Sequence, residues 1–220
     1  MNEHRTLLTC GEHAVLVEVA GLDDVLALAQ AIREAVAAGS AGFTGVVDVV
    51  PAARTVLVIV QHDAAIAPVR QALRLLPAVS PNELPASEEV TEILVHYDGP
   101  DLDEVAELTG LSVEEVVAAH TRHDWRVAFG GFAPGFAYLI GGDPRLEVPR
   151  RSEPRTSVPG GSVALAGEFS AIYPRSSPGG WQLIGRTDTV LFDPDREPPA
   201  LLQSGGAVRF VAVAGKRDGC

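Results

Sequence analysis

The first part of the chain alternates short apolar runs with helical segments. Residues Ala14–Val19 form an apolar run of strand length, and Asp23 and Asp24 open a helical run that ends at Gly39. Acidic residues at a helix start and glycine at its end are the usual helix signals. The order ββαββα predicts a two-layer α+β sandwich. The remaining predicted elements are the strands Val46–Val50 and Thr55–Val60 and a helix, Ala64–Leu76, capped by Asp63.

Prolines then interrupt any regular element. Pro77, Pro81 and Pro85 fall in PAVSPNELPASEE, a polar, proline-rich segment that is typical of a linker. We therefore place a domain boundary near Glu83–Glu89. Residues 1–85 are predicted to form an α+β, ferredoxin-like domain, and residues 86–220 a second domain.

The second part begins with one strand and two short helices and then becomes rich in β-structure. Ser112, with Glu115 three positions later, forms a capping box, and Gly110 separates the two helices. Short strands between Gly/Pro turns favour a barrel or a sandwich. The predicted helices are Asp101–Gly110 and Ser112–His120, and the predicted strands are Thr91–Tyr97, Arg126–Phe129, Phe136–Ile140, Ser162–Ala166, Ala171–Tyr173, Trp181–Arg186, Val190–Phe192 and Ala207–Val213.

Glycine, proline, arginine and aromatic residues are concentrated between Ala128 and Phe192. Glycine lets other groups approach the main chain closely, and proline stiffens loops. The stretch also holds six arginines. We interpret it as the functional face, built of rigid loops that carry cationic and aromatic side chains over short strands. Its aromatic residues include Phe132, Phe136, Tyr138, Tyr173 and Trp181.

The net charge of −12 is unevenly distributed. From Arg122 to Arg186, eight arginines stand against five acidic residues, a balance of +3, while the remainder holds nine basic and 24 acidic residues, a balance of −15. The acidic total argues against binding to nucleic acid or to an anionic membrane. Guanidinium groups suit carboxylates and phosphates, so the arginines favour an anionic small molecule or an acidic partner segment. Pairing with nearby Glu and Asp is the alternative.

The chain also lacks the marks of a membrane or exported protein. No apolar run reaches the roughly 20 residues that span a bilayer. The N-terminal residues MNEHRTLLTC do not have the basic and then apolar order of a signal peptide. We expect a cytoplasmic protein.

Several chemistries are excluded by residues that the sequence lacks. Its only lysine is Lys216, which excludes a G-x-x-x-x-G-K-[ST] phosphate loop, a Ser/Lys amidase site and a biotin-carrier lysine in the body of the chain. It has no H-E-x-x-H or C-x-x-C, so no metal site is expected, and no G-x-S-x-G. His120 and His123, with Asp124 adjacent, suggest a base or a ligand pair. The alternative is a helix-terminal histidine that interacts with the helix dipole.

Four motifs follow one another through the glycine-rich stretch: GFAPGFAYL (Gly131–Leu139), VPGGSVALAG (Val158–Gly167), IYP (Ile172–Pro174) and SPGGWQLIGRT (Ser177–Thr187). They closely resemble the signatures of the 5-oxoprolinase B-subunit family, which is also described as allophanate hydrolase subunit 1 or the kinase-inhibitor KipI type. The resemblance extends to Gly99–His120 before these motifs and to Leu191–Asp193 after them. Several long motifs in one order make it specific.

This resemblance implies both a fold and an assembly. The fold would be an α+β N-terminal domain followed by a mainly β, cyclophilin-like barrel of the carboxyltransferase type. The family implies a stable partnership with a homologous barrel protein, the C subunit, and with an A subunit. In this family, the assembled complex uses ATP to hydrolyse 5-oxo-L-proline to L-glutamate. This chain would hold no cofactor of its own and would not act alone.

The candidate site follows from the same resemblance and from the residue types. Arg155 and Arg186 would hold a carboxylate, and His120 is a third catalytic candidate. Aromatic side chains would wall a water-poor pocket, and backbone N–H groups of the double glycines would polarise a carbonyl. The predicted substrate-binding residues are Phe132, Pro134, Gly135, Phe136, Tyr138, Ser157, Gly160, Gly161, Gly179, Gly180, Trp181 and Thr187.

Two other interpretations belong to different functional classes. The family's other name suggests a regulatory protein that inhibits a sensor histidine kinase, and an acidic chain without its own nucleophile is compatible with that role. The barrel fold alone would suggest a prolyl isomerase, but a fold does not carry a function.

Overall fold

The chain divides into two units, Met1–Pro85 and Ala86–Cys220. The computed structural model describes residues 5–77 and 90–213. The boundary predicted near Glu83–Glu89 lies outside the described residues. Each unit has its own hydrophobic core.

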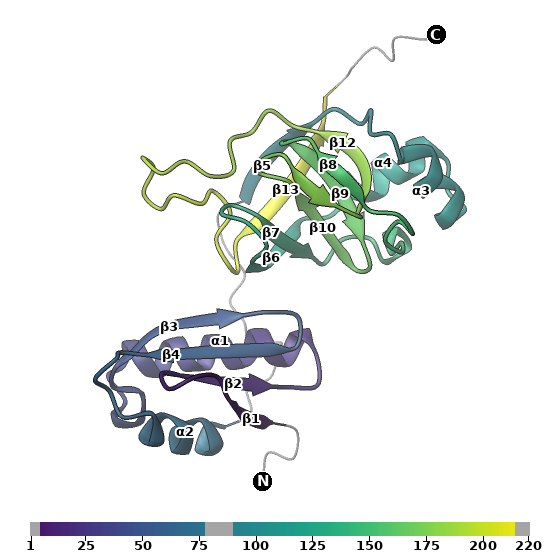
Figure 1. The fold of residues 1–220 in the computed structure, drawn as a ribbon. Coiled ribbons are helices and arrows are strands. Elements are labelled where there is room, and N and C mark those ends of the chain that lie inside the picture. Colours follow the sequence, from purple (N-terminus) through teal and green to yellow (C-terminus); the bar gives the residue numbers. More distant parts are fainter. Residues whose placement is uncertain (1–4, 78–89, 214–220) are drawn as a thin grey trace. The chain divides into compact units, whose positions relative to one another are not determined.

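Alternating valines build the first unit. Val15 and Val17 on one strand and Val56 and Val58 on another point inward into a single core, which residues of both helices complete. The four strands form an antiparallel sheet in the order β1-β2-β4-β3, and the two helices therefore cover the same face of it (Figure 1). The elements are β1 (Thr6–Thr9), β2 (Ala14–Glu18), α1 (Leu22–Ala37), η1 (Ala41–Phe43), β3 (Val46–Pro51), β4 (Thr55–Val60) and α2 (Ile66–Leu75).

The predicted order ββαββα is confirmed, although the sequence pattern assigned no residues to its first strand, β1, and one predicted cap is wrong. Helix α2 begins at Ile66 with Ala65 at the N-cap position, and no side chain caps it. The Ala64 N–H instead donates to the Gln61 carbonyl oxygen at 3.0 Å. Residues 61–64 therefore form a turn, which leaves Asp63 outside the helix.

The second unit is a nearly closed barrel. Its seven-stranded sheet has the order β12-β9-β10-β7-β6-β13-β5. The two end strands meet where the His96 and Arg186 main chains exchange two hydrogen bonds of 2.9 Å, and the Gly99 N–H adds a third to the Ile184 carbonyl oxygen. The strands are β5 (Val90–Val95), β6 (Trp125–Gly130), β7 (Ala137–Ile140), β9 (Ser162–Ala166), β10 (Phe169–Ile172), β12 (Gln182–Arg186) and β13 (Ala207–Ala212), with the helices α3 (Leu102–Thr109), α4 (Val113–Arg122) and η3 (Pro144–Leu146).

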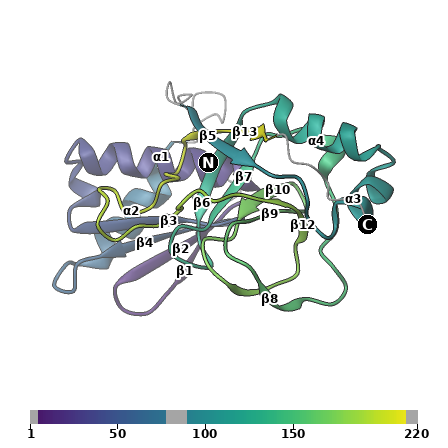
Figure 2. The same cartoon turned by 90° about the horizontal axis from the view of Figure 1, so that it is seen from above.

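Alternation along the strands gives the barrel an inner and an outer face. On β9, Val163 and Leu165 join the inner core, to which all seven strands contribute, whereas Ala164 and Ala166 join a second cluster on the other face. Helices α3 and α4 pack together onto the inner core at one side of the barrel (Figure 2). No helix in the described part of the chain is long and apolar enough to cross a membrane.

The helix signals of this unit are confirmed, and one predicted strand is wrong. Ser112 and Glu115 form the capping box, and Gly110 ends α3 with φ of 69°. Residues 190–192 are not a strand. Phe192 makes only an isolated bridge to Ala200, because this segment pairs with its own returning loop. Two strands that the sequence pattern did not predict, β8 (Arg155–Val158) and β11 (Ser177–Gly179), form a separate ribbon.

The barrel closure depends on a glycine. A Cβ atom at Gly99 would overlap the main chain of Leu183 and Ile184. We expect Gly99→Ala to lower the free energy of unfolding by about 1–3 kcal/mol, the usual cost of overpacking, measured by urea denaturation. Gly130→Ala is the control, because its Cβ would meet only an ordinary contact at 3.6 Å. Equal stability of the two variants would contradict this account of the closure.

Candidate functional site

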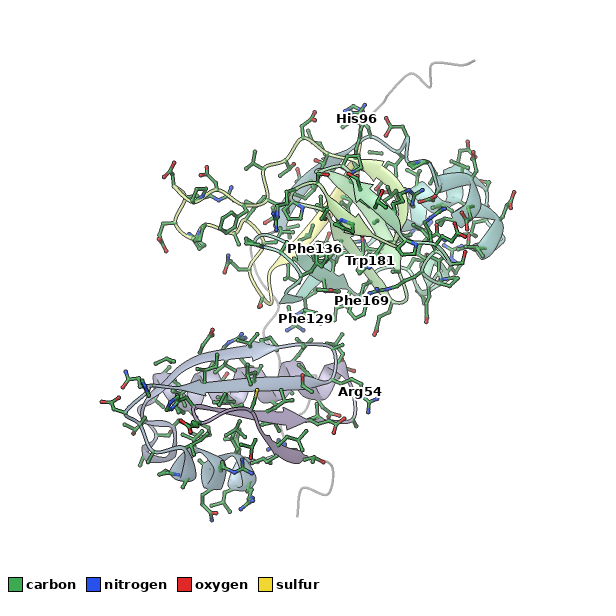
Figure 3. All side chains as sticks on the ribbon, viewed as in Figure 1. Arg54, His96, Phe129, Phe136, Phe169 and Trp181 are labelled. Carbon is green, nitrogen blue, oxygen red and sulfur yellow. The ribbon has the colours of Figure 1, made fainter. Side chains whose placement is uncertain are left out.

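Seven aromatic side chains form a continuous cluster on the outer face of the barrel. Figure 3 shows Phe129, Phe136, Phe169 and Trp181 gathered in one part of the second unit. Trp181 meets Phe136 edge to face at 5.7 Å between ring centroids, and Phe129 stacks on Tyr138 at 4.5 Å. Such arrangements are favoured by the ring quadrupole. We call this set the aromatic cluster: Phe129, Phe132, Phe136, Tyr138, Phe169, Tyr173 and Trp181.

Small side chains on the barrel strands make room for these rings. Ala164, Ala166 and Ala171 are buried beneath the cluster. Tyr173 is the most buried ring of the aromatic cluster, at 2% exposure. Burial raises the pKa of the Tyr173 hydroxyl, while a hydrogen bond from the Trp181 main chain and the charges of Arg150 and Arg155 lower it. The aromatic cluster therefore has cationic groups within electrostatic reach.

Two arginines, Arg150 and Arg155, place positive charge beside the aromatic cluster. The Arg150 guanidinium lies 5.8 Å from the centroid of the Trp181 ring, within cation–π range. Arg155 places its Nη2 2.7 Å from an Asp101 oxygen, and its buried Nη1 has no hydrogen-bond partner among the described residues. Arg155 is thus held by Asp101 through one nitrogen, while the other is buried and lies beside no acceptor in the described part of the chain.

Asp101 is the centre of a buried ionic network. One carboxylate oxygen accepts hydrogen bonds from Arg151 and Arg155, each at 2.7 Å, and the other accepts the Leu183 N–H at 2.7 Å. Its side chain is only 3% exposed. Asp101 stands at the N-cap position of α3 but makes no capping bond. The carboxylate therefore joins the start of α3 to β12 and to the segment that leads into β8.

Arg186 lies at a different place, beside the seam of the barrel. Its Nε donates to an Asp98 oxygen at 2.9 Å, and both side chains are about half exposed. Gly161 and Thr187 are close to this strand end. The Thr187 N–H donates to the Gly161 carbonyl oxygen, while the Gly161 N–H donates to the Tyr173 carbonyl oxygen. The Gly161 N–H is consequently engaged within the fold, and a substrate carbonyl would have to use another donor.

The other predicted binding residues lie on the loops and the ribbon around the cluster. Ser157 is exposed on β8 and shares a hydrogen bond with Ser176. Gly160 precedes β9. Gly179 is the last residue of β11, and the carbonyl oxygen of Gly180, which follows it, accepts the Arg151 N–H. Pro134 and Gly135 belong to the β6–β7 turn. Phe132, at 60% exposure, stands at the edge of the aromatic cluster.

His120 lies inside the barrel unit, away from this face. It is fully buried, stacks on Phe210 and forms hydrogen bonds to Tyr97 through Nδ1 and to Ser170 through Nε2. Burial lowers the pKa of His120 to about 3, so the ring is neutral near pH 7. This placement gives the ring no surface from which to reach a substrate. Within residues 5–77 and 90–213, no three His, Cys, Asp or Glu side chains gather as a metal site.

Sequence reasoning missed four residues around this face. Asp101 looked like an ordinary acidic helix start, and Gln182, which is buried and donates to Glu104, looked like a strand residue. Arg150 and Arg151 stood next to each other in VPRRSEPR, and this doubled arginine beside a predicted anion site was the available signal.

Residues 5–202 match the carboxyltransferase domain family, subdomain C and D. The chain belongs to this family. The resemblance read from the motifs is also confirmed, because curated relatives are named as the B subunit of 5-oxoprolinase. One, from Bacillus subtilis, is 48% identical over 133 residues, which is 59% of this chain and 55% of the relative. Another, from Escherichia coli O157:H7, is 50% identical over 123 residues, 54% of this chain and 56% of the relative.

The chain thus matches little more than half the length of these curated relatives. Among solved structures, TTHA0988 is 36% identical with a TM-score of 0.76, and the match covers 92% of this chain and 40% of that one. The urea amidolyase of K. lactis, at 19% identity and a TM-score of 0.70, shares the fold over 95% of this chain and 15% of its own. The mixed fold with a barrel-like second unit, expected from the resemblance, is confirmed.

The ionic network predicts a large effect of removing its central charge. Asp101→Asn should lower the free energy of unfolding by roughly 3 kcal/mol, because Arg151 and Arg155 lose a buried partner. Asp98→Asn, which removes the exposed partner of Arg186, should cost less than about 1 kcal/mol. Urea denaturation of both variants measures the difference. A similar small loss in both would show that the buried carboxylate does not hold the fold together.

The buried histidine predicts a pH dependence of stability. The folded-state pKa of about 3 lies below the unfolded value of about 6.5, so the unfolded state binds the extra proton between these values. Stability is fully present above pH 6.5 and should fall by up to about 1.4 kcal/mol per pH unit below it. The His120→Gln variant should lack this loss of stability between pH 6.5 and 5. Parallel stability curves for the variant and the natural protein would contradict the assignment.

Proposed function

We propose that this chain is the B subunit of an ATP-dependent 5-oxoprolinase complex, which hydrolyses 5-oxo-L-proline to L-glutamate together with an A subunit and a C subunit. The observation that carries the proposal is the 46–50% identity to three curated proteins named as the B subunit of 5-oxoprolinase. That name supports membership of a multi-subunit hydrolase. The identity covers 123–133 residues, and we infer the substrate and the partners from that matched part.

The chemistry of the candidate site is compatible with such a substrate. 5-Oxoproline is a small lactam ring with apolar edges, one amide and one carboxylate. Trp181 and the neighbouring rings offer an apolar wall, and Arg150 and Arg155 offer guanidinium groups beside it. A carboxylate bound by a guanidinium fork next to an aromatic face is a common mode of recognition. We assign the carboxylate to Arg155 and Arg150.

Arg186 and the partner subunits complete the proposed site. Arg186, half exposed and paired with Asp98, remains a predicted second contact to the substrate. The chain has no phosphate loop of the G-x-x-x-x-G-K-[ST] type, so we assign ATP use to the assembled complex and no cofactor to this chain. We assign the part of the site that this chain lacks to the C subunit, a homologous barrel protein.

The proposal is tested by reconstitution. The chain is produced alone, with the C subunit, and with both the A and C subunits, and 5-oxoproline-dependent ATP hydrolysis is measured for each. Activity is expected only when all three proteins are present. Absence of activity in the three-protein mixture, with each protein folded and soluble, would overturn the proposal.

Arg150 offers a sharp test of substrate recognition within that complex. Arg150→Ala removes an exposed guanidinium beside Trp181 and should lower kcat/KM about 10- to 100-fold, the effect of losing a hydrogen bond to a charged group. Arg54→Ala, an exposed arginine of the first unit, is the matched control and should leave kcat/KM unchanged. Gel filtration of both complexes checks assembly. Equal kcat/KM for the two variants would remove Arg150 from the site.

A further inference from the structure

Phe132 adopts a strained conformation in the turn between β6 and β7. Its φ is 64°, and across it the Ala133 N–H donates to the Gly131 carbonyl oxygen at 2.7 Å. A hydrogen bond between residues i and i+2 around a centre with positive φ defines the rare, strained form of γ-turn. Among the described residues, Phe132 is the only non-glycine residue with positive φ. Strain of this kind persists where the surrounding structure imposes it, often at functional positions.

The turn directs an aromatic ring into solvent. Phe132 touches Phe136 at 5.2 Å between ring centroids, yet 60% of it stays exposed. A Cβ on Gly135 would lie 2.7 Å from that of Phe192, so the turn adjoins the loop that carries Val190 and Phe192. These two residues are 61% and 38% exposed. We call Phe132, Val190 and Phe192 the tip patch.

The loop behind the patch is held in place by one side chain. The Arg196 guanidinium donates to the carbonyl oxygens of Val190, Leu191 and Pro199 at 3.0–3.4 Å. The Leu201 N–H donates to the Leu191 carbonyl oxygen at 2.8 Å. Apolar side chains on a loop that is already ordered lose little conformational entropy on binding. The tip patch is therefore pre-organised for a contact.

The same loop has a strongly acidic border. Between Asp188 and Glu197 there are four carboxylates and one guanidinium, a balance of −3. Asp188, Asp195 and Glu197 are exposed. A second copy of this chain would bring the same carboxylates against them, which is repulsive. The charge therefore favours a different chain, with basic residues around an apolar pocket.

We propose that the tip patch is the docking surface for the C subunit, with Phe132 inserted into an apolar pocket that Lys or Arg residues border. The identity of this partner rests on the proposed function. An exposed aromatic anchor with a polar rim is the usual composition of an energetic centre in an interface.

The test uses the strain itself. Phe132→Gly removes the anchor and replaces it with a residue that accepts positive φ, so the melting temperature should stay the same or rise. Affinity for the purified C subunit, measured by calorimetry, should fall roughly 30-fold, as for loss of a main interface anchor. Leu94→Ala is the matched control, because Leu94 is 57% exposed on β5 and outside the patch.

The outcomes separate the two proposals. Failure of the natural chain to bind the C subunit overturns both the docking surface and the proposed partnership. Binding that Phe132→Gly leaves unchanged, or that Leu94→Ala weakens equally, overturns the docking surface alone. A replacement of Asp195 and Glu197 by Asn and Gln should also slow association at low salt and reduce its salt dependence. An unchanged association rate would overturn the basic border assigned to the partner.

Discussion

A single buried carboxylate holds three parts of the barrel unit together. Asp101 binds the main chain of β12 through one oxygen and two arginines through the other. Burying this charge is costly, and the cost is offset only because every bond is short and each partner is fixed. The position of Arg155, and with it the cationic side of the aromatic cluster, depends on this arrangement. The first helix of the unit is therefore also a support for the candidate site.

Much of the fold could be predicted because its signals are local. The capping box of Ser112 and Glu115 spans four residues, and the valine alternation of β4 is contained in one hexapeptide. The Asp101 network could not be predicted in this way. Its partners lie 50 to 82 residues away, and no pattern near Asp101 distinguishes a network centre from an ordinary helix start.

The candidate site was predictable in composition but not in geometry. Aromatic residues among glycines and prolines indicated a shaped face, and Phe136, Tyr138 and Trp181 do lie together. Residue types do not reveal on which side of a barrel a side chain falls. His120 was attractive by type, yet its helix places it among Phe210, Tyr97 and Ser170 in the interior. Phe132 shows the opposite case, because its type matches the buried rings, whereas its φ is positive and its side chain is 60% exposed.

The position of β13 in the sheet has a consequence for the order of synthesis. This strand lies between β5 and β6 in the sheet and pairs with β5 in parallel. In the sequence, all the other barrel strands come between β5 and β13. While a ribosome releases the chain, β5 has no neighbour on that side until residue 212 has emerged. Such non-local pairing slows folding and leaves strand edges unpaired in the meantime. The barrel therefore closes as a late, cooperative event, after nearly all of its sequence has left the ribosome.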